Sequence, residues 1–161
     1  MNAIGIYGVE AEDVDVAVRL LDAQLREHDI STATAALREV VRAVVADDRH
    51  GFMYLARTGD RAVGLAYAAA HLSAEHGGVI GWLEELYVSP DCRGEGVGSL
   101  LLREVISRAQ QLNWRGLELE VVAGHERAAA LYLRHGFLPA PRARYTRLFE
   151  VSTPAGFDRT A

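Results

Sequence analysis

The chain has 161 residues, half of them hydrophobic, and a formal net charge of −5 at pH 7. This length suffices for one substantial core and is too short for two ordinary domains, so we expect residues 1–161 to form a single domain. The acidic balance argues against a nucleic-acid surface and leaves cationic partners open. No apolar run approaches the length of a membrane helix and no secretory signal is evident, so we expect a cytoplasmic location.

Helical and strand-like patterns alternate along the chain, without repeats or low-complexity segments. In the first two expected helices, apolar residues three and four positions apart form one stripe, which is typical of a core-facing helix. In chain order we expect a strand at 3–9, helices at 11–28 and 33–46, strands at 51–57 and 62–72, a strand ending at Val88, a helix at 97–112, a strand at 117–122, a helix at 126–135 and a final strand at 144–151. This order predicts a mixed α/β fold.

The segment from Leu86 to Leu102 carries the strongest functional signal. An apolar strand is followed by a turn containing Pro90, by three alternating glycines at Gly94, Gly96 and Gly98, and by a helical pattern. Glycines let the backbone approach a ligand, and the free N–H groups that open the helix attract an anion. Arg93 adds a full positive charge at the mouth of this turn. We therefore predict a cradle for a phosphate group.

Spacing separates three interpretations of this cradle. A Walker A loop requires a lysine and a Ser or Thr after its last glycine, but Ser99 follows Gly98 directly. A dinucleotide fingerprint would place the third glycine one residue later than Gly98. The pattern Arg93-x-x-Gly96-x-Gly98 instead resembles the pyrophosphate-binding loop of the GNAT superfamily of N-acetyltransferases, whose ligand is acetyl-CoA. The alternative is a tight strand-to-helix turn without a ligand.

Two further segments carry the resemblance, which spans roughly residues 50 to 140. Residues 126–137 look like the later helix of the family, with Tyr132 where the family places its proton donor and a Gly-Phe step at the end. Residues 82–88 resemble the central strand that carries the acceptor-side carboxylate, most nearly as in diamine and polyamine acetyltransferases. The resemblance implies a GNAT-like fold: a central, mixed, mostly antiparallel twisted sheet, flanked by about four helices, with a strand splay that holds acetyl-CoA.

The resemblance also implies which residues bind the cofactor. These are Leu86, Tyr87, Val88, Arg93, Gly94, Glu95, Gly96, Val97, Gly98, Ser99 and His125. At His125 the chain departs from the family, which usually has a helix-capping Asn there, and histidine is a poor N-cap.

Acetyl transfer to an amine requires a proton acceptor for the amine and a proton donor for the departing thiolate. Desolvation and mutual repulsion should raise the pKa of at least one of Glu84 and Glu85. We assign Glu84 as the base, or as the residue that holds a base water, and Glu85 as an amine-binding residue. Because adjacent strand residues face opposite sides, we expect only one of the two to point into a cleft. Both could instead be surface positions of an edge strand.

Tyr132 remains protonated at neutral pH and can serve as the acid, although an aromatic residue at this spacing could also belong to the core. By resemblance, Asp29 borders the acceptor pocket. Cys92 is the only cysteine, which excludes an intrachain disulfide. Its position before the cradle favours direct attack in a ternary complex over an acyl-enzyme.

We therefore predict an acetyl-CoA-dependent N-acetyltransferase that acts on a primary amine of a small cationic acceptor. The sequence leaves open an amino acid or a protein N-terminus as the acceptor, and a catalytically silent CoA-binding or regulatory domain. The histidines show no ligand spacing, so we predict no metal. As partners we expect a small-molecule amine, with no nucleic acid and no membrane, and we leave a homodimer open.

Overall fold

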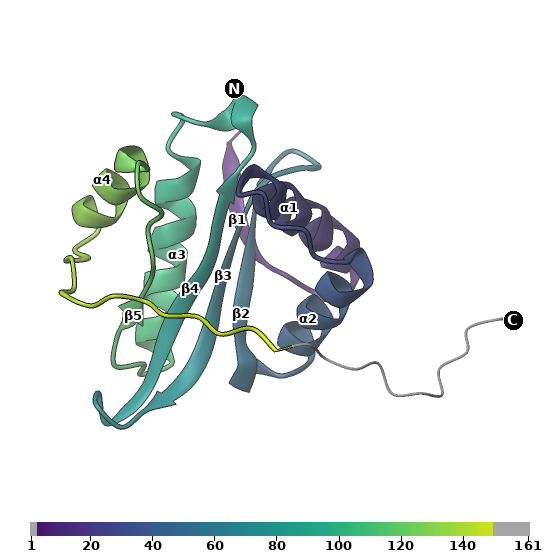
Figure 1. The fold of residues 1–161 in the computed structure, drawn as a ribbon. Helices are drawn as coiled ribbons and strands as arrows, with labels where there is room; N and C mark the ends of the chain where they lie inside the picture. Colours follow the sequence, from purple (N-terminus) through teal and green to yellow (C-terminus); the bar gives the residue numbers. More distant parts are fainter. Residues whose placement is uncertain (1–2, 150–161) are drawn as a thin grey trace, which may run out of the picture.

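A five-stranded sheet with the order β1-β2-β3-β4-β5 forms the centre of the fold (Figure 1). The structure, a computed structural model, describes residues 3–149. Strands β1 to β4 are antiparallel neighbours, whereas β5 lies parallel to β4. The strands are β1 (Ile4–Gly8), β2 (Gly51–Thr58), β3 (Arg61–Ser73), β4 (Gly78–Val88) and β5 (Leu117–Glu118). This arrangement confirms the predicted mixed α/β class.

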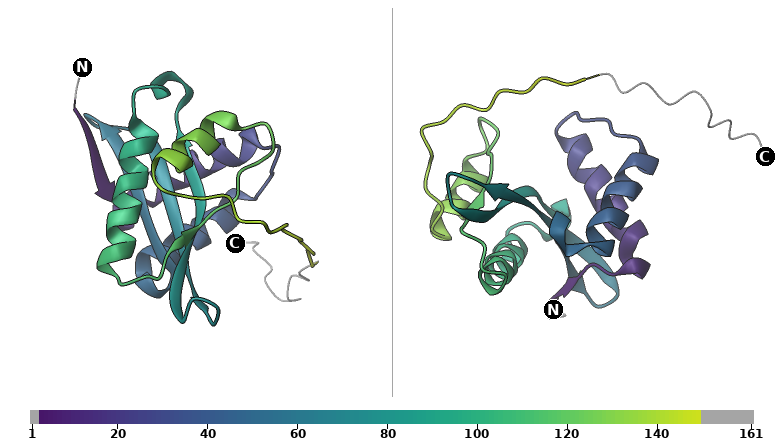
Figure 2. Two further views of the ribbon diagram at one scale, coloured as in Figure 1. Left: turned by 90° about the vertical axis from the view of Figure 1, so that its left-hand side faces the viewer. Right: turned by 90° about the horizontal axis from the view of Figure 1, so that it is seen from below.

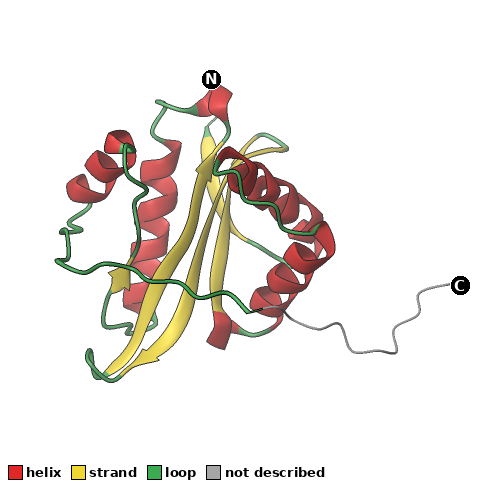
Figure 3. Cartoon of the chain, viewed as in Figure 1, coloured by secondary structure: helices red, strands yellow, loops and turns green. Residues whose placement is uncertain are grey.

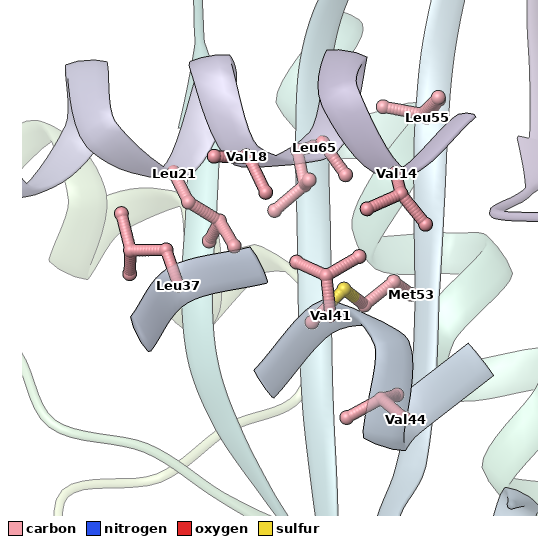
Figure 4. Close-up of a cluster of buried hydrophobic side chains, with 10 residues drawn as sticks. Val14, Val18, Leu21, Leu37, Val41, Val44, Met53, Leu55 and Leu65 are labelled. Atoms are coloured by element: carbon pink, nitrogen blue, oxygen red, sulfur yellow. The ribbon is translucent and has the colours of Figure 1, made fainter. Parts of the chain in front are cut away.

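Helices cover both faces of the sheet, as the view from below shows (Figure 2). The helices are α1 (Val14–Glu27), α2 (Thr34–Ala46), α3 (Val97–Gln111) and α4 (Glu126–Arg134). The apolar stripes of α1 and α2 pack against β2 and β3 in one buried cluster, with Val18, Val41 and Leu65 among its members (Figure 4). On the other face, Leu101, Leu102 and Val105 of α3 are fully buried against β3 and β4. Helices α1, α2 and α3 are thus each fixed by burial of one apolar face.

Most predicted elements are present, and two strands are corrected. The predicted strand at 117–122 contains only Leu117 and Glu118, because the chain then leaves β4 and residues 119–122 have no strand to pair with. The predicted strand at 144–151 is not formed in residues 144–149, which Figure 3 draws as loop. Residues 150–151 of that prediction lie outside the described residues. The first helix begins at Val14, after a 3₁₀ turn at Ala11–Asp13.

The separation of β4 and β5 opens the sheet beside the predicted cradle. The two strands pair only at Gly81 with Leu117 and at Trp82 with Glu118. Beyond this point, β4 has no strand partner on that side among residues 3–149. Backbone amide and carbonyl groups of the last residues of β4 on this side are therefore available to a ligand, except the Val88 carbonyl, which accepts a hydrogen bond from Arg93.

Candidate active site

The cradle forms where β4 leads into α3. A 3₁₀ turn at Pro90–Cys92 is followed by Gly94 with φ of 91° and by Gly96 with φ of 85°, a region that glycine enters without steric cost. Gly96 is the N-cap of α3, and a Cβ at that position would meet no heavy atom within 4 Å. The backbone at Gly96 therefore faces open space, next to the unpaired N–H groups of the first turn of α3. A phosphate can approach these groups closely.

Arg93 does not present a free charge to this cradle. Its Nη2 donates to both carboxylate oxygens of Glu27 at 2.7 Å, and its Nε donates to the carbonyl oxygen of Val88 at 2.8 Å. The side chain therefore ties the end of α1 to the end of β4. The sequence could not reveal this pairing, because Glu27 lies 66 positions away.

Arg127 of α4 supplies a second cation that the sequence analysis missed. Its Nη2 lies 3.2 Å from the place where a Cβ on Gly94 would be, so the guanidinium sits against the cradle. No carboxylate among the described residues forms an ion pair with it. The spacing of Gly94 and Arg127 in the sequence gives no sign of this contact, which arises from the packing of α4 beside α3.

A β-bulge in β4 places the two glutamates on one side of the sheet. Tyr67 of β3 pairs with Glu85 and the next residue, Ala68, pairs with Leu83, so Glu84 is the extra residue. Leu83 and Leu86 both pack on the α3 side, whereas simple alternation would put them on opposite faces. The two residues between them therefore point away from α3. The expectation that only one glutamate can face a cleft is wrong for this reason.

The surroundings of the two carboxyl groups differ. Glu85 is half-buried, and desolvation raises its pKa, while a hydrogen bond from Gln24 of α1 opposes the shift. Glu84 is exposed at the level of the whole residue, but the protein around its carboxyl still raises its pKa by desolvation, against the attraction of Arg144. Both groups are therefore better proton acceptors than an ordinary glutamate.

Tyr132 lies on α4, close enough to Glu85 for the two to influence each other. Burial and then the negative charge of Glu85 raise the pKa of Tyr132 to about 12. The ring packs edge-on against Phe137, with 5.7 Å between the ring centroids, and against the α3 cluster. The phenol is thus held protonated near Glu85, which suits a proton donor.

The remaining predicted cofactor residues lie around the cradle with different side-chain environments. Val97 and Tyr87 are buried, so they can offer a ligand mainly their backbone groups. The Ser99 hydroxyl lies 2.6 Å from Nε2 of His135, which links α3 to the end of α4. Glu95 is exposed. Leu86 and Val88 are half-buried and pack on the α3 side.

His125 and Asp29 lie at the ends of neighbouring helices. His125 is the N-cap of α4 and forms no side-chain cap, as expected for histidine. Its ring centroid is 5.3 Å from that of His28, which ends α1 and contacts Gln24 at 3.4 Å. Asp29 is exposed, with a positive φ of 57°. Thus α1, β4 and α4 converge on one region that contains Gln24, Glu85 and Tyr132.

Comparison with known proteins decides the family. The sequence profile of the acetyltransferase (GNAT) family matches residues 18–137. The chain belongs to this family. The match includes β4, the cradle, α4 and the part of α1 from residue 18 onward, so it covers every residue of the candidate site named above except Arg144. No curated protein sequence was found to match the chain.

Solved structures with the same fold include proteins of several kinds. An integron cassette protein from the mobile metagenome of Cole Harbour Salt Marsh is 24% identical, with 91% of each chain covered and a TM-score of 0.81. A predicted acetyltransferase from Clostridium acetobutylicum, solved with acetyl-CoA, is 16% identical, with coverage of 90% of this chain and 96% of that one and a TM-score of 0.77. The aminoglycoside N-acetyltransferase AAC(6')-Iy, solved with CoA, is 17% identical, with coverage of 92% and 96% and a TM-score of 0.77. At these identities the likeness concerns the fold.

The GNAT cradle of this chain has the features that a CoA pyrophosphate needs. The space above Gly96 is open, helix N–H groups border it, and the Arg127 guanidinium lies beside it. Among residues 3–149, no group of three or more His, Cys, Asp or Glu side chains is arranged to hold a metal ion. None of the helices in the same part of the chain is long and apolar enough to cross a membrane.

Proposed function

We propose that this GNAT protein transfers the acetyl group of acetyl-CoA to a primary amine of a small, cationic acceptor. The observation that carries the proposal is the proximity of Glu85, whose carboxyl group has a raised pKa, to the protonated Tyr132, together with the β-bulge that turns Glu84 to the same side of the sheet as Glu85. The site lies at the separation of β4 and β5. A fold that only bound CoA would not need this arrangement of acid and base groups.

We assign the cofactor to the cradle and to the free edge of β4. Backbone N–H groups at Gly96 and in the first turn of α3 would bind the pyrophosphate, with the Arg127 guanidinium as the cation beside them. We assign Arg93 a structural role instead, because its guanidinium already donates hydrogen bonds to Glu27 and to the carbonyl oxygen of Val88. His125 and Ser99 remain proposed contacts of the cofactor, as do Leu86, Tyr87, Val88, Gly94, Glu95, Val97 and Gly98.

Glu84 and Glu85 act at the acceptor nitrogen. An alkylamine with a pKa near that of lysine is neutral in only about one molecule in a few thousand near neutral pH, so the site must remove a proton. Glu84 takes this proton, because its raised pKa makes it a better base and its exposure lets the proton pass on to water. Glu85 binds the acceptor ammonium, and its charge adds to the effect of burial in keeping Tyr132 protonated.

The β4 backbone and Tyr132 act on the thioester carbonyl and on the departing thiolate. Acetyl-CoA supplies an acetyl group activated as a thioester. Backbone N–H groups at the end of β4 stabilise the carbonyl oxygen as it gains negative charge. As the N–C bond forms and the C–S bond breaks, Tyr132 donates its phenolic proton to the sulfur and is then reprotonated from water. No covalent enzyme intermediate is needed, so Cys92 takes no part.

Charge supports a cationic acceptor. Glu84 and Glu85 face the proposed acceptor side, and the chain carries a net charge of −5. Proteins of the same fold include aminoglycoside N-acetyltransferases, which favours a similar acceptor class here. Asp29, exposed at the end of α1, is assigned to the rim of this acceptor site.

The test is an amine screen with acetyl-CoA in which the release of free thiol is followed. Polyamines and aminoglycosides form one arm, and amino acids and N-terminal peptides form the other. We expect turnover in the first arm. Calorimetric titration with CoA provides the second measurement: binding of CoA without turnover of any amine would favour a silent CoA-binding or regulatory domain. A single domain over residues 1–161 and a cytoplasmic location stay predictions from the sequence.

A further inference from the structure

The last turn of α1 carries three polar residues on one side of the helix. They are Gln24 and Glu27 within α1 and His28, which is its C-cap. Residues three and four positions apart are neighbours on a helix surface, so the three side chains share one side. Gln24 and His28 are half-buried and Glu27 is exposed. We call these three residues the α1 end face.

The α1 end face is attached to both β4 and α4. Glu27 accepts two hydrogen bonds from Arg93, whose Nε donates to the carbonyl oxygen of Val88 at the end of β4. The centroid of the His28 ring lies 5.3 Å from that of His125, the N-cap of α4. The α1 end face is therefore held against the end of β4 on one side and against the start of α4 on the other.

Gln24 lies between these two attachments and donates a hydrogen bond to Glu85. The ladder explains why the two meet. Tyr67, which pairs with Glu85, packs against the buried cluster of α1 and α2, so Glu85 points to the same face of the sheet. Leu21 and Leu25, on either side of Gln24 in the sequence, also belong to this packing. Helix α1 thus brings the Gln24 amide to the strand position of Glu85.

The contacts of Gln24 define the orientation of its amide. The nitrogen Nε2 lies 3.4 Å from Nε2 of His28. An amide nitrogen carries two hydrogens, whereas a carboxylate only accepts hydrogen bonds. The nitrogen can therefore donate to Glu85 and to an unprotonated Nε2 of His28 at the same time. With both hydrogens engaged, the amide holds the Glu85 carboxylate in one direction.

The two glutamates of the candidate site differ in this respect. Glu84 is exposed and lies near the positive charge of Arg144, whereas Glu85 is half-buried and accepts the hydrogen bond from Gln24. A carboxylate that is already oriented binds an ammonium group more tightly than one that turns freely, because less conformational entropy is lost on binding. The environment of Glu85 therefore suits binding of the acceptor.

We propose that Gln24 is a positioning residue for the acceptor: it holds the Glu85 carboxylate toward the acceptor ammonium, and His28 holds Gln24 in that orientation. The inference rests on the proposed binding of the acceptor by Glu85. Because Gln24 acts through Glu85, its loss should weaken acceptor binding and leave the chemical step nearly unchanged.

The first test follows the carboxyl group of Glu85 without any substrate. Protein with isotopically labelled glutamate is titrated by NMR, and the Glu85 signal is the one that is absent from Glu85→Gln. Gln24→Met has a similar shape and no donor, so the pKa of Glu85 should rise further, because the carboxylate loses a hydrogen bond. Gln24→Lys restores a donor and should lower this pKa. An unchanged pKa in Gln24→Met, or a rise in both variants, would overturn the proposal.

Gln111→Met is the matched control for this titration. The Nε2 of Gln111 also lies 3.4 Å from a side chain four positions away, the Ser107 hydroxyl, but Gln111 ends α3. This variant should leave the pKa of Glu85 unchanged, and an equal rise in it would make the effect of Gln24→Met unspecific and refute the positioning role. His28→Phe keeps a ring beside His125 and removes the second acceptor of Gln24, so the pKa of Glu85 should rise by a smaller amount.

The second test uses steady-state kinetics with spermidine and kanamycin as acceptors. Gln24→Met should raise the acceptor KM about three- to tenfold and change kcat by less than about twofold. In a Glu85→Gln background the same substitution should have no further effect, and additive effects would contradict the inference. If Glu85→Gln leaves the acceptor KM unchanged, or neither amine is acetylated, the proposed function fails instead. The NMR titration then decides by itself whether Gln24 holds Glu85.

Discussion

Replacing Tyr132 with phenylalanine is the most direct test of the proposed chemistry. The change removes the phenolic proton and keeps the ring, whose edge-on contact with Phe137 and partial burial beside α3 fix its position. We expect the affinity for acetyl-CoA and the thermal midpoint to stay nearly unchanged, because only the hydroxyl is lost. Any loss of turnover then reports on proton transfer.

The size of the loss follows from the pKa of the donor. Burial and the charge of Glu85 raise the pKa of Tyr132 to about 12, whereas a free thiol has a pKa of about 8.5. Transfer to the sulfur is therefore uphill once the thiolate has formed, which places the benefit at the lower end of what general acids contribute. We expect kcat to fall by roughly ten- to a thousandfold. The loss should shrink with acyl donors whose thiols are more acidic, since a better leaving group needs less help.

The assay is thiol release under saturating acetyl-CoA, measured for both proteins from mildly acidic to alkaline pH. Because Tyr132 titrates only near pH 12, the wild-type profile should have no descending limb from this group within the measured range. A Tyr132→Phe variant with full activity would remove the residue from the mechanism. A variant with a lowered thermal midpoint and no specific loss in kcat would assign the tyrosine to the core.

Three further predictions concern the base and the cradle. Glu84 is active as a carboxylate, and desolvation raises its pKa, so activity should rise with pH through a pKa above that of an ordinary glutamate. Glu84→Gln should lose most activity near neutral pH and least at high pH, where the amine is already neutral. Gly96→Val should weaken CoA binding in calorimetry, whereas Gly136→Val, with the same φ of 85° and equally open space, should impose similar backbone strain and leave CoA affinity unchanged. Arg127→Gln should weaken CoA binding, and the loss should depend on the salt concentration. Arg93→Gln should mainly lower the thermal midpoint, because it leaves the carboxylate of Glu27 unpaired. A larger loss of CoA affinity in Arg93→Gln than in Arg127→Gln would assign the phosphate contact to Arg93.

The sequence alone determined the features that depend on short-range spacing. The predicted bounds of the four helices lie within a few residues of the observed ones, and for the first two helices the apolar stripe carried the prediction, because helical burial repeats every three to four positions. The turn with Gly94 and Gly96 was readable because few residues other than glycine adopt a positive φ. The order of elements and the motif spacing then led to the GNAT family, which the profile match confirms.

The tertiary structure decided what depends on pairing between distant segments. Strand periodicity predicted opposite directions for Glu84 and Glu85, but the register against Tyr67 and Ala68 of β3 introduces a bulge that turns both the same way. An arginine beside a glycine turn predicts a phosphate ligand, yet Glu27, distant in sequence, neutralises Arg93.

The two overpredicted strands have the same cause. Residues 119–122 and 144–149 carry strand-like residues, and that preference is satisfied only where a second strand supplies the hydrogen bonds. Whether such a partner exists is decided by where the rest of the chain goes. The sequence thus determined which segments could form strands, and the packing of the whole chain determined which of them did, because a ladder needs two strands and local spacing describes only one.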